Sequence, residues 1–196
     1  KNFLFIFYPY GKIFFIDLDE DKISLKKIDT NLHDFFKNIE YSAQTIKDIE
    51  IVDKKFYVSF VNRKRENCFN TSIATANINF DSLNFKLFFD PEMCLGFKNE
   101  KIGQIKINAS GGRIEYYNDE KIFFTIGNYL SPPVAQNDKK IFGKILEINL
   151  KNKQNKIISK GHRNPQGLLY LKDKKILISS EHADFGGDEI NILNLN

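Results

Sequence analysis

The chain has 196 residues and a formal net charge of +4, and 42% of its residues are hydrophobic. This length allows one sizeable core or several small stacked cores. The charge is mild, so the sequence shows no extended basic surface of the kind that nucleic-acid-binding proteins carry. The short cluster Arg63-Lys64-Arg65 lies in a polar stretch, where we expect a solvated loop. No segment reaches the ~18 apolar residues of a membrane-spanning helix.

The first ten residues do not have the pattern of a secretory signal peptide. Lys1 precedes an apolar run, but the run is short and has no cleavage site of small residues. We therefore interpret Lys1 as a boundary inside a longer protein.

One short motif recurs four times along the chain. Each copy has a polar turn, a Lys, and then a short run of aromatic and β-branched residues, which is typical of a buried strand. The copies occupy residues 10–16, 53–58, 119–125 and 173–179.

Strand-like segments surround these copies. Segments 112–117 and 166–171 precede the third and fourth copies through short polar turns, which predicts hairpins. Alternating segments follow the last three copies at 72–80, 143–150 and 189–195. The unit is a meander of about four strands that recurs roughly every 40–65 residues, which is the pattern of a propeller blade. A β-helix would have shorter rungs, and a β-sandwich would not need the Lys-led strand to recur in each unit.

We therefore predict an all-β fold, a β-propeller with about three to four blades of four antiparallel strands. Residues 1–196 would form a single domain, and because a partial ring leaves strand edges unpaired, further blades or a partner would have to close it. One short helix is expected at 31–39, with His33 as a surface or packing residue rather than a ligand.

The two cysteines, Cys68 and Cys94, are too few and too far apart for a zinc site. They would form a disulfide in an oxidising compartment or remain as two buried thiols in a reducing one.

Three polar stretches exceed what strands and turns require. In 161–167, Arg163 and Asn164 offer a fork of donors and an amide, which suits a cofactor with several oxyanions or a sugar. The alternative is a structural loop in which Arg163 pairs with a carboxylate and Asn164 caps a turn. Stretch 180–191 combines carboxylates with glycines, as calcium loops do. Stretch 108–113, followed by 125–129, has paired glycines that permit close backbone approach, or form a turn between blades.

Together these stretches resemble the glucose/sorbosone dehydrogenase family, most strongly over 108–196. The sequences that carry the resemblance are Gly-His-Arg-Asn-Pro-Gln-Gly, Ser-Glu-His followed by Gly-Gly-Asp-Glu-Ile-Asn, Gly-Gly-Arg-Ile and Thr-Ile-Gly-Asn. The resemblance implies a six-bladed propeller that binds pyrroloquinoline quinone (PQQ) and calcium and oxidises an aldose at C1. It also implies a periplasmic or secreted location.

The resemblance assigns roles to particular residues. Arg163 and Asn164 match the cofactor-contacting pair, and Glu189 matches a ligand of a structural calcium. The Gly-Pro pair whose carbonyls bind the catalytic calcium reads Ala183-Asp184 in this chain.

The catalytic base departs from the family pattern. The family places a His shortly before the Gly-Arg strand, whereas this chain has Asn108 and Ala109 there. Neither side chain accepts a proton near neutral pH. His162 or His182 would have to replace the family base. Otherwise the chain would be a catalytically inactive propeller that binds a sugar, a glycan or a protein. A propeller hydrolase ranks third, because its carboxylates would come from several blades rather than from one loop.

Overall fold

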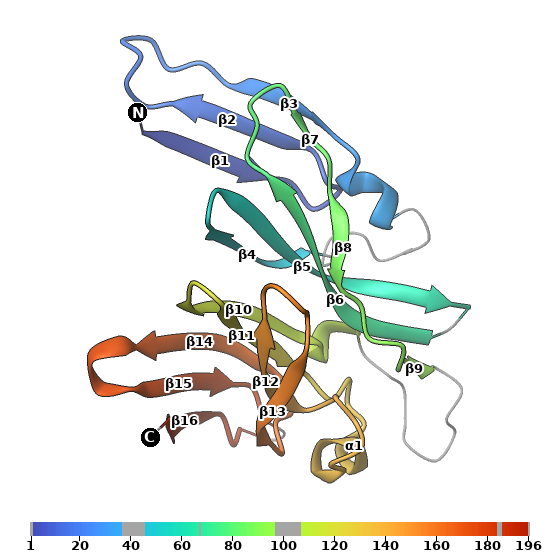
Figure 1. Cartoon of the computed structure of the whole chain (residues 1–196). Helices are drawn as coiled ribbons and strands as arrows, with labels where there is room; N and C mark the ends of the chain where they lie inside the picture. Colours follow the sequence, from blue (N-terminus) through green and yellow to red (C-terminus); the bar gives the residue numbers. More distant parts are fainter. Residues whose placement is uncertain (1, 37–45, 67, 97–106, 184–185, 196) are drawn as a thin grey trace.

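The computed structural model describes residues 2–36, 46–66, 68–96, 107–183 and 186–195. They form four β-sheets whose first strands follow one another along the chain, with the N-terminus in the first sheet and the C-terminus in the last (Figure 1). Within these residues, no helix is long and apolar enough to cross a membrane.

The first two sheets contain most of the N-terminal half. The first comprises β1 (Phe3–Phe7), β2 (Ile13–Asp17), β3 (Lys26–Thr30) and β7 (Ser82–Leu83), of which β7 runs parallel to β3. The second comprises β4 (Ile46–Val52), β5 (Lys55–Arg65), β6 (Cys68–Asn77) and β8 (Lys86–Phe89), and β9 (Leu95–Gly96) pairs with the start of β6. The 3-10 helix η1 (Leu32–Phe36) follows β3.

The last two sheets contain the C-terminal half. The third follows the 3-10 turn η3 (Ile107–Ala109) and comprises β10 (Gly111–Asn118), β11 (Lys121–Ile126), β12 (Lys144–Asn149) and β13 (Asn155–Lys160), with α1 (Pro132–Gln136) between β11 and β12. The fourth comprises β14 (Pro165–Leu171), β15 (Ile176–Glu181) and β16 (Glu189–Asn194), with η4 (Lys172–Lys174) in its first turn. Within each of these sheets, consecutive strands pair antiparallel.

The predicted all-β, partial propeller fold is confirmed, because the four sequence repeats fall on β2, β5, β11 and β15, the second strand of each sheet. Two local predictions change. The predicted helix at 31–39 is a 3-10 helix over Leu32–Phe36, and its last residues lie outside the described part. The loop predicted at Arg63-Lys64-Arg65 is wrong, because β5 extends through these residues and Lys64 pairs with Asp90 at 2.5 Å.

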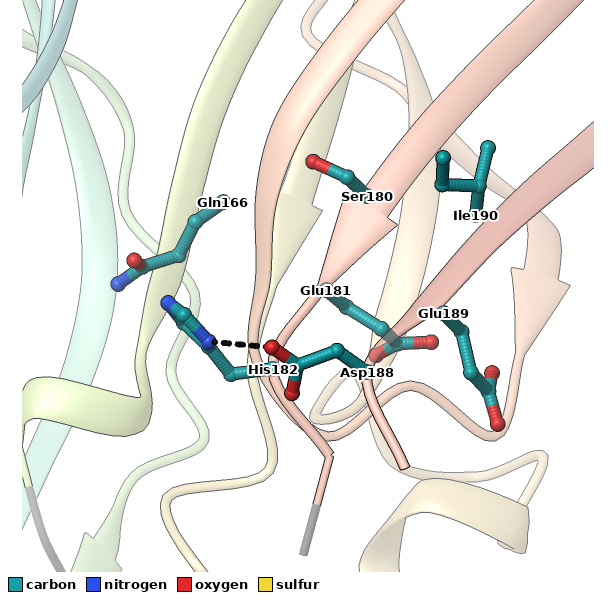
Figure 2. A pocket seen from close by; sticks show the side chains of 7 residues that line it. All are labelled: Gln166, Ser180, Glu181, His182, Asp188, Glu189 and Ile190. Atoms are coloured by element: carbon teal, nitrogen blue, oxygen red, sulfur yellow. Dashed lines mark hydrogen bonds and ion pairs between the residues drawn. The ribbon is translucent and has the colours of Figure 1, made fainter. Parts of the chain in front are cut away.

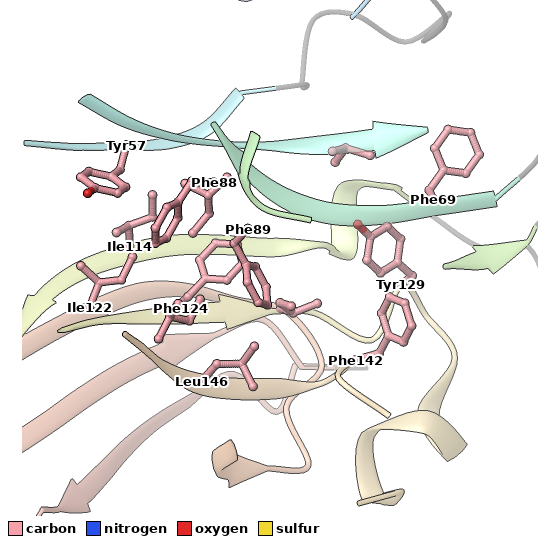
Figure 3. Packing of buried hydrophobic residues seen from close by; sticks show 14 of the residues in the cluster. Tyr57, Phe69, Phe88, Phe89, Ile114, Ile122, Phe124, Tyr129, Phe142 and Leu146 are labelled. Atoms are coloured by element: carbon pink, nitrogen blue, oxygen red, sulfur yellow. The ribbon is translucent and has the colours of Figure 1, made fainter. Parts of the chain in front are cut away.

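Strand β11 shows why its run of apolar residues is continuous. Ile122 and Phe124 pack in a cluster with β5, β8 and β12. Phe123 faces the other way and packs with Ile145 of β12 and with Leu177 of the next sheet. A strand buried on both faces has no polar alternation. Figure 3 shows the first of these clusters between the second and third sheets.

A disulfide joins Cys68, at the start of β6, to Cys94, just before β9. The two cysteines are 26 residues apart, so the disulfide closes a loop that contains β8. Replacing both cysteines with serine should lower the free energy of unfolding by about 3 kcal/mol, because the unfolded chain loses its cross-link. Urea unfolding of both proteins measures this difference. Equal midpoints would show that the cross-link adds no stability.

Candidate functional site

The first strands of the last three sheets, β4, β10 and β14, lie side by side. Each has a β-bulge near its first residues. Lys47 is the extra residue between the pairs that Ile46 and Asp48 make with β5, the register of β10 shifts between Gly111 and Ile114, and Gln166 is the extra residue in β14. Bulges bend a strand and redirect its side chains. Three blades therefore present redirected side chains at the same end of their inner strands.

These bulges surround a cleft of about 500 Å³. Its lining combines two cationic side chains with amide groups and one imidazole, and comprises Ile46, Lys47, Asn108, Gly111, Arg113, Asn164, Gln166 and His182. A second hollow of about 320 Å³ adjoins it across Gln166 and His182 and reaches Glu181, Asp188 and Glu189. Figure 2 shows His182 between Gln166 and Asp188.

The loop after β11 brings two of the predicted stretches together. The Gly127 N–H donates to the Ser110 carbonyl at 2.8 Å, and the Tyr129 N–H donates to the Ala109 carbonyl at 2.9 Å. The Asn128 N–H donates to the Arg163 carbonyl at 2.8 Å. Stretches 108–113 and 161–167 are therefore fixed to one loop.

Tyr129 anchors this loop in the core. Its hydroxyl is 2.7 Å from Thr71 Oγ1, and the side chain is fully buried beside Phe142. Burial raises the pKa of Tyr129, although the bond to Thr71 acts against this, so the phenol stays protonated. The support beneath the cleft is therefore uncharged and rigid.

Of the predicted pair, Asn164 lines the cleft and Arg163 lies next to it in the chain, and both have structural contacts. Arg163 donates from a guanidinium nitrogen to the His182 carbonyl at 2.9 Å. Asn164 is buried, its Oδ1 accepts from the Gly111 N–H at 3.1 Å, and it lines the cleft. Asn164 therefore joins the third and fourth blades through its oxygen, while its Nδ2 donates no hydrogen bond within the described residues.

His162 is buried and bonded through both ring nitrogens. Its Nδ1 is 3.0 Å from Glu181 Oε1 and its Nε2 is 2.7 Å from Ser159 Oγ. The hypothesis that His162 replaces the family base therefore has no support, since neither nitrogen is open to a substrate.

Glu181 fixes the stretch that contains His162 and Arg163. Its carboxylate accepts from His162, from the Arg163 N–H at 2.8 Å and from Asn191 Nδ2 at 3.0 Å. Burial alone would raise the pKa of Glu181, but the hydrogen bond and charge of His162, together with the other two donors, outweigh it and lower the pKa. Glu181 is therefore a buried anion that fixes the loop of Arg163.

The two residues at the family base position, Asn108 and Ala109, differ in their exposure. Asn108 is exposed and lines the cleft, whereas Ala109 is buried at 5% exposure. A side chain at 108 can therefore reach a ligand in the cleft, and a side chain at 109 points into the packed interior.

The described carboxylates of the acidic stretch 180–191 do not converge on one point as calcium ligands would. Ala183 donates its N–H to Asp188 Oδ1 at 3.1 Å, and Asp188 Oδ2 is 3.4 Å from His182 Nδ1. Glu189 is exposed beside the second hollow, and Asp184 lies outside the described residues. Among the residues described, no three His, Cys, Asp or Glu side chains converge as metal ligands.

Charge in the cleft comes from Lys47 and Arg113. Arg113 pairs with Asp48 at 3.2 Å, and burial raises the pKa of Asp48 even though the Ile114 N–H and Arg113 act against it. Burial lowers the pKa of Lys47 to about 8. The cleft therefore contains one cation that is paired and one that loses its proton easily.

Sequence reasoning missed Lys47, Arg113 and Gln166 as cleft residues. Arg113 and Gln166 lie within stretches already selected, but Lys47 lies in an ordinary strand pattern. Only the bulge in β4 turns it toward the cleft, and a bulge leaves no distinct sequence signal here.

Comparisons with known proteins agree with this architecture. The family described as glucose/sorbosone dehydrogenase matches residues 47–195. An uncharacterized protein of Synechocystis, slr1608, is 31% identical over 118 residues, and this match covers 47% of the present chain and 29% of that protein.

Solved structures share the fold. The soluble aldose sugar dehydrogenase of Escherichia coli, in its apo form, superposes with a TM-score of 0.69 at 19% identity, covering 97% of this chain and 56% of that one. The PQQ-bound aldose sugar dehydrogenase of Streptomyces coelicolor gives 0.72 at 18% identity, covering 98% and 57%. The chain thus spans little more than half the length of these structures, and less than a third of the Synechocystis protein.

Proposed function

Because the chain belongs to the glucose/sorbosone dehydrogenase family, we propose that it forms part of a PQQ-dependent sugar dehydrogenase that oxidises the C1 hydroxyl of an aldose. The geometry of the cleft supports this proposal in addition to family membership. The family-like stretches around Asn108, Arg113 and Asn164 line one cleft at the end of three inner strands. Ligand sites are concave and contain a few convergent polar groups.

The donors of this cleft fit the proposed cofactor. Arg113 supplies positive charge, and Asn108, Asn164 and Gln166 supply amide donors. Such groups suit a planar quinone that carries several carboxylates. When bound, PQQ supplies the hydride acceptor, which no amino-acid side chain can provide.

The chain's own residues would bind and orient this cofactor and the sugar. We expect Asn164 to donate from Nδ2 while its Oδ1 stays bonded to Gly111, which fixes the amide plane. The guanidinium of Arg163, fixed to the His182 carbonyl, would add positive charge at the same loop. Because these contacts exist without ligand, little ordering is needed on binding.

A matched pair of variants separates the two roles of Asn164. Asn164→Asp keeps the oxygen that accepts from Gly111 but replaces the amide donor with a charge that repels carboxylates. Asn164→Leu removes both. We expect the Asp variant to retain most of its stability and to bind PQQ at least about tenfold more weakly, a change of about 1.4 kcal/mol. The Leu variant should also lose about 1–3 kcal/mol of folding stability, because the Gly111 N–H stays buried and unpaired. Thermal unfolding and PQQ titration measure the two effects, and unchanged PQQ affinity in the Asp variant would remove Asn164 from the binding site.

Calcium dependence is proposed on family membership alone. The positions concerned are Ala183, Asp184 and Glu189, and no three His, Cys, Asp or Glu side chains of the described residues form a metal cage. Thermal unfolding with calcium chloride, magnesium chloride or a chelator tests it. A shift in the midpoint with calcium alone supports the proposal, and identical midpoints contradict it.

A binding-only propeller is the second candidate. Ala109 supports it, because the buried methyl group at the family base position cannot accept a proton. In that case a sugar or glycan would stabilise the protein without being oxidised.

Reconstitution distinguishes the two candidates. The chain is incubated with PQQ and calcium, and reduction of an electron-accepting dye is followed as aldoses are added. Dye reduction that requires both PQQ and an aldose supports the dehydrogenase. Stabilisation by the sugar without dye reduction supports the binding module.

We also propose that residues 1–196 form one domain and that further blades or a partner complete the ring. Leu169, Ile190 and Ile192 are more than half exposed on the fourth sheet. These apolar side chains suit the face of another blade. The disulfide between Cys68 and Cys94 fits a periplasmic or secreted location, where such bonds persist.

A further inference from the structure

Lys47 is a charged residue of the cleft that lies outside every stretch selected from the sequence. It is the bulged residue of β4, and its side chain lies against Gly112 of the next blade. A Cβ placed on Gly112 would lie only 2.4 Å from the Lys47 Cβ. Gly112 therefore leaves the room that Lys47 occupies, and its φ of +105° is one that glycine adopts readily.

This position is close to the family base position. Gly112 follows Ala109 by three residues, and Lys47 and Asn108 line the same cleft. A lysine carries its amine on a flexible four-carbon stem, so it can reach a ligand from a neighbouring strand. The buried Ala109 and the amide of Asn108 leave the proton-accepting task open at this place.

The other titratable groups of the cleft are less suited to the task. Arg113 is paired with Asp48 and, as a guanidinium, stays protonated. His182 is more than half exposed, and its Nδ1 is oriented by the equally exposed Asp188. The side chain of Lys47 makes no hydrogen bond or ion pair within the described part of the chain. Burial of an unpaired amine favours its uncharged form, which can accept a proton.

We propose that Lys47 is the proton acceptor of the sugar oxidation, in place of the family histidine. This inference rests on the proposed function. The O–H bond of the C1 hydroxyl breaks and its proton joins the uncharged Nζ of Lys47. The C1–H bond breaks with both electrons, which leave as hydride for the quinone, and the oxygen forms a C=O bond with C1. The sugar is oxidised, the quinone is reduced, and the lysine leaves the step as an ammonium that returns its proton to water.

The electrostatic surroundings are consistent with this role. Burial lowers the pKa of Lys47 to about 8, which places a useful fraction of the uncharged amine near neutral pH. Activity should therefore rise with pH as Lys47 loses its proton. The charged or titratable groups around it are Asp48 and Glu50 on β4, Arg113 and Glu115 on β10, and Arg163 and His182 in the adjoining loops.

The first test measures the proton itself and needs no turnover. The full chain is labelled at lysine with an acylating reagent over a range of pH, and mass spectrometry quantifies each site. The exposed Lys151 serves as the internal reference. Lys47 is expected to become reactive near pH 8, and PQQ with an aldose should protect it. A Lys47 that titrates at the ordinary lysine value of 10.5 would overturn the proposal.

The second test separates proton transfer from binding of a carboxylate. Lys47→Met should lower kcat about 10²- to 10⁴-fold, the usual contribution of a general base, with unchanged PQQ affinity. Lys47→Arg should be equally slow, because a guanidinium cannot accept a proton. If Lys47→Arg keeps its kcat, or if Lys47→Met loses PQQ affinity instead, Lys47 is an anchor and the proposal is wrong.

The outcomes separate this inference from the proposed function. If PQQ neither binds to the unmodified chain nor is reduced there, the dehydrogenase assignment fails. If the Lys47→Met variant binds PQQ as tightly as the unmodified chain and the aldose reduces the bound PQQ equally fast, only the inference fails. If the rise of kcat with pH is lost in His182→Gln but kept in Lys47→Met, the base is His182.

Discussion

Replacing Glu181 with Gln is expected to cost about 1–3 kcal/mol of folding free energy near neutral pH, the usual cost of leaving a buried hydrogen-bonding group unsatisfied. The carboxylate accepts hydrogen bonds from three donors, on His162, Arg163 and Asn191. A glutamine presents an NH₂ group to at least one of them. The loop of Arg163 and Asn164 should then loosen, and PQQ binding should weaken with it.

The pH dependence of this loss follows from the lowered pKa of Glu181. The folded protein favours the carboxylate, so its contribution is complete above the unfolded pKa, ordinarily 4.5, and disappears as pH falls through the lower folded pKa. The stability difference between the original protein and Glu181→Gln should therefore narrow in acid. Urea unfolding across this range measures it.

Glu92→Gln is the matched control, because Glu92 is exposed and lies outside both this network and the proposed calcium positions. Its stability should change by no more than about 0.5 kcal/mol. A Glu181→Gln protein as stable as this control, or a difference that does not change in acid, would contradict the account of the buried pair.

The second large effect is a rescue at the family base position. In a Lys47→Met background, Asn108→His should raise kcat about 10²-fold, because residue 108 lines the cleft and an imidazole accepts protons near neutral pH. The pH at which activity rises should move to about 6.5, the ordinary pKa of histidine. Steady-state kinetics across pH measure both changes.

Ala109→His is the control for this rescue. Position 109 is buried, so the larger side chain should cost about 1–3 kcal/mol through overpacking and restore no activity. If Ala109→His restores turnover and Asn108→His does not, then residue 108 is not the one that faces the substrate.

Much of the fold could be predicted from sequence because a propeller repeats its signals. The Lys-led apolar runs fall on β2, β5, β11 and β15. The run of β11 is buried on both faces between neighbouring sheets, as Ile122, Phe123 and Phe124 show. The extension of β5 through Arg65 was missed, since its partner β6 and the ion pair of Lys64 with Asp90 are tertiary contacts. Polar composition there indicated a loop, and strand pairing overrode it.

The site was less predictable than the fold. The stretches around Asn108 and Asn164 could be selected by composition and resemblance, but their junction through Gly111 depends on the packing of two blades. Lys47 could not be predicted, because one extra residue in β4 determines which way its side chain points. The difference between Asn108 and Ala109 likewise depends on the 3-10 turn that buries one and exposes the other.

The most direct test of the dehydrogenase assignment is the absorption spectrum of the PQQ-loaded chain before and after one addition of an aldose, with no electron acceptor present. We expect the spectrum of the oxidised quinone to be replaced by that of the reduced quinone in proportion to the bound PQQ, and this change to slow in Lys47→Met. Saturable PQQ binding with a spectrum that the sugar leaves unchanged would contradict the assignment and identify the chain as a binding module.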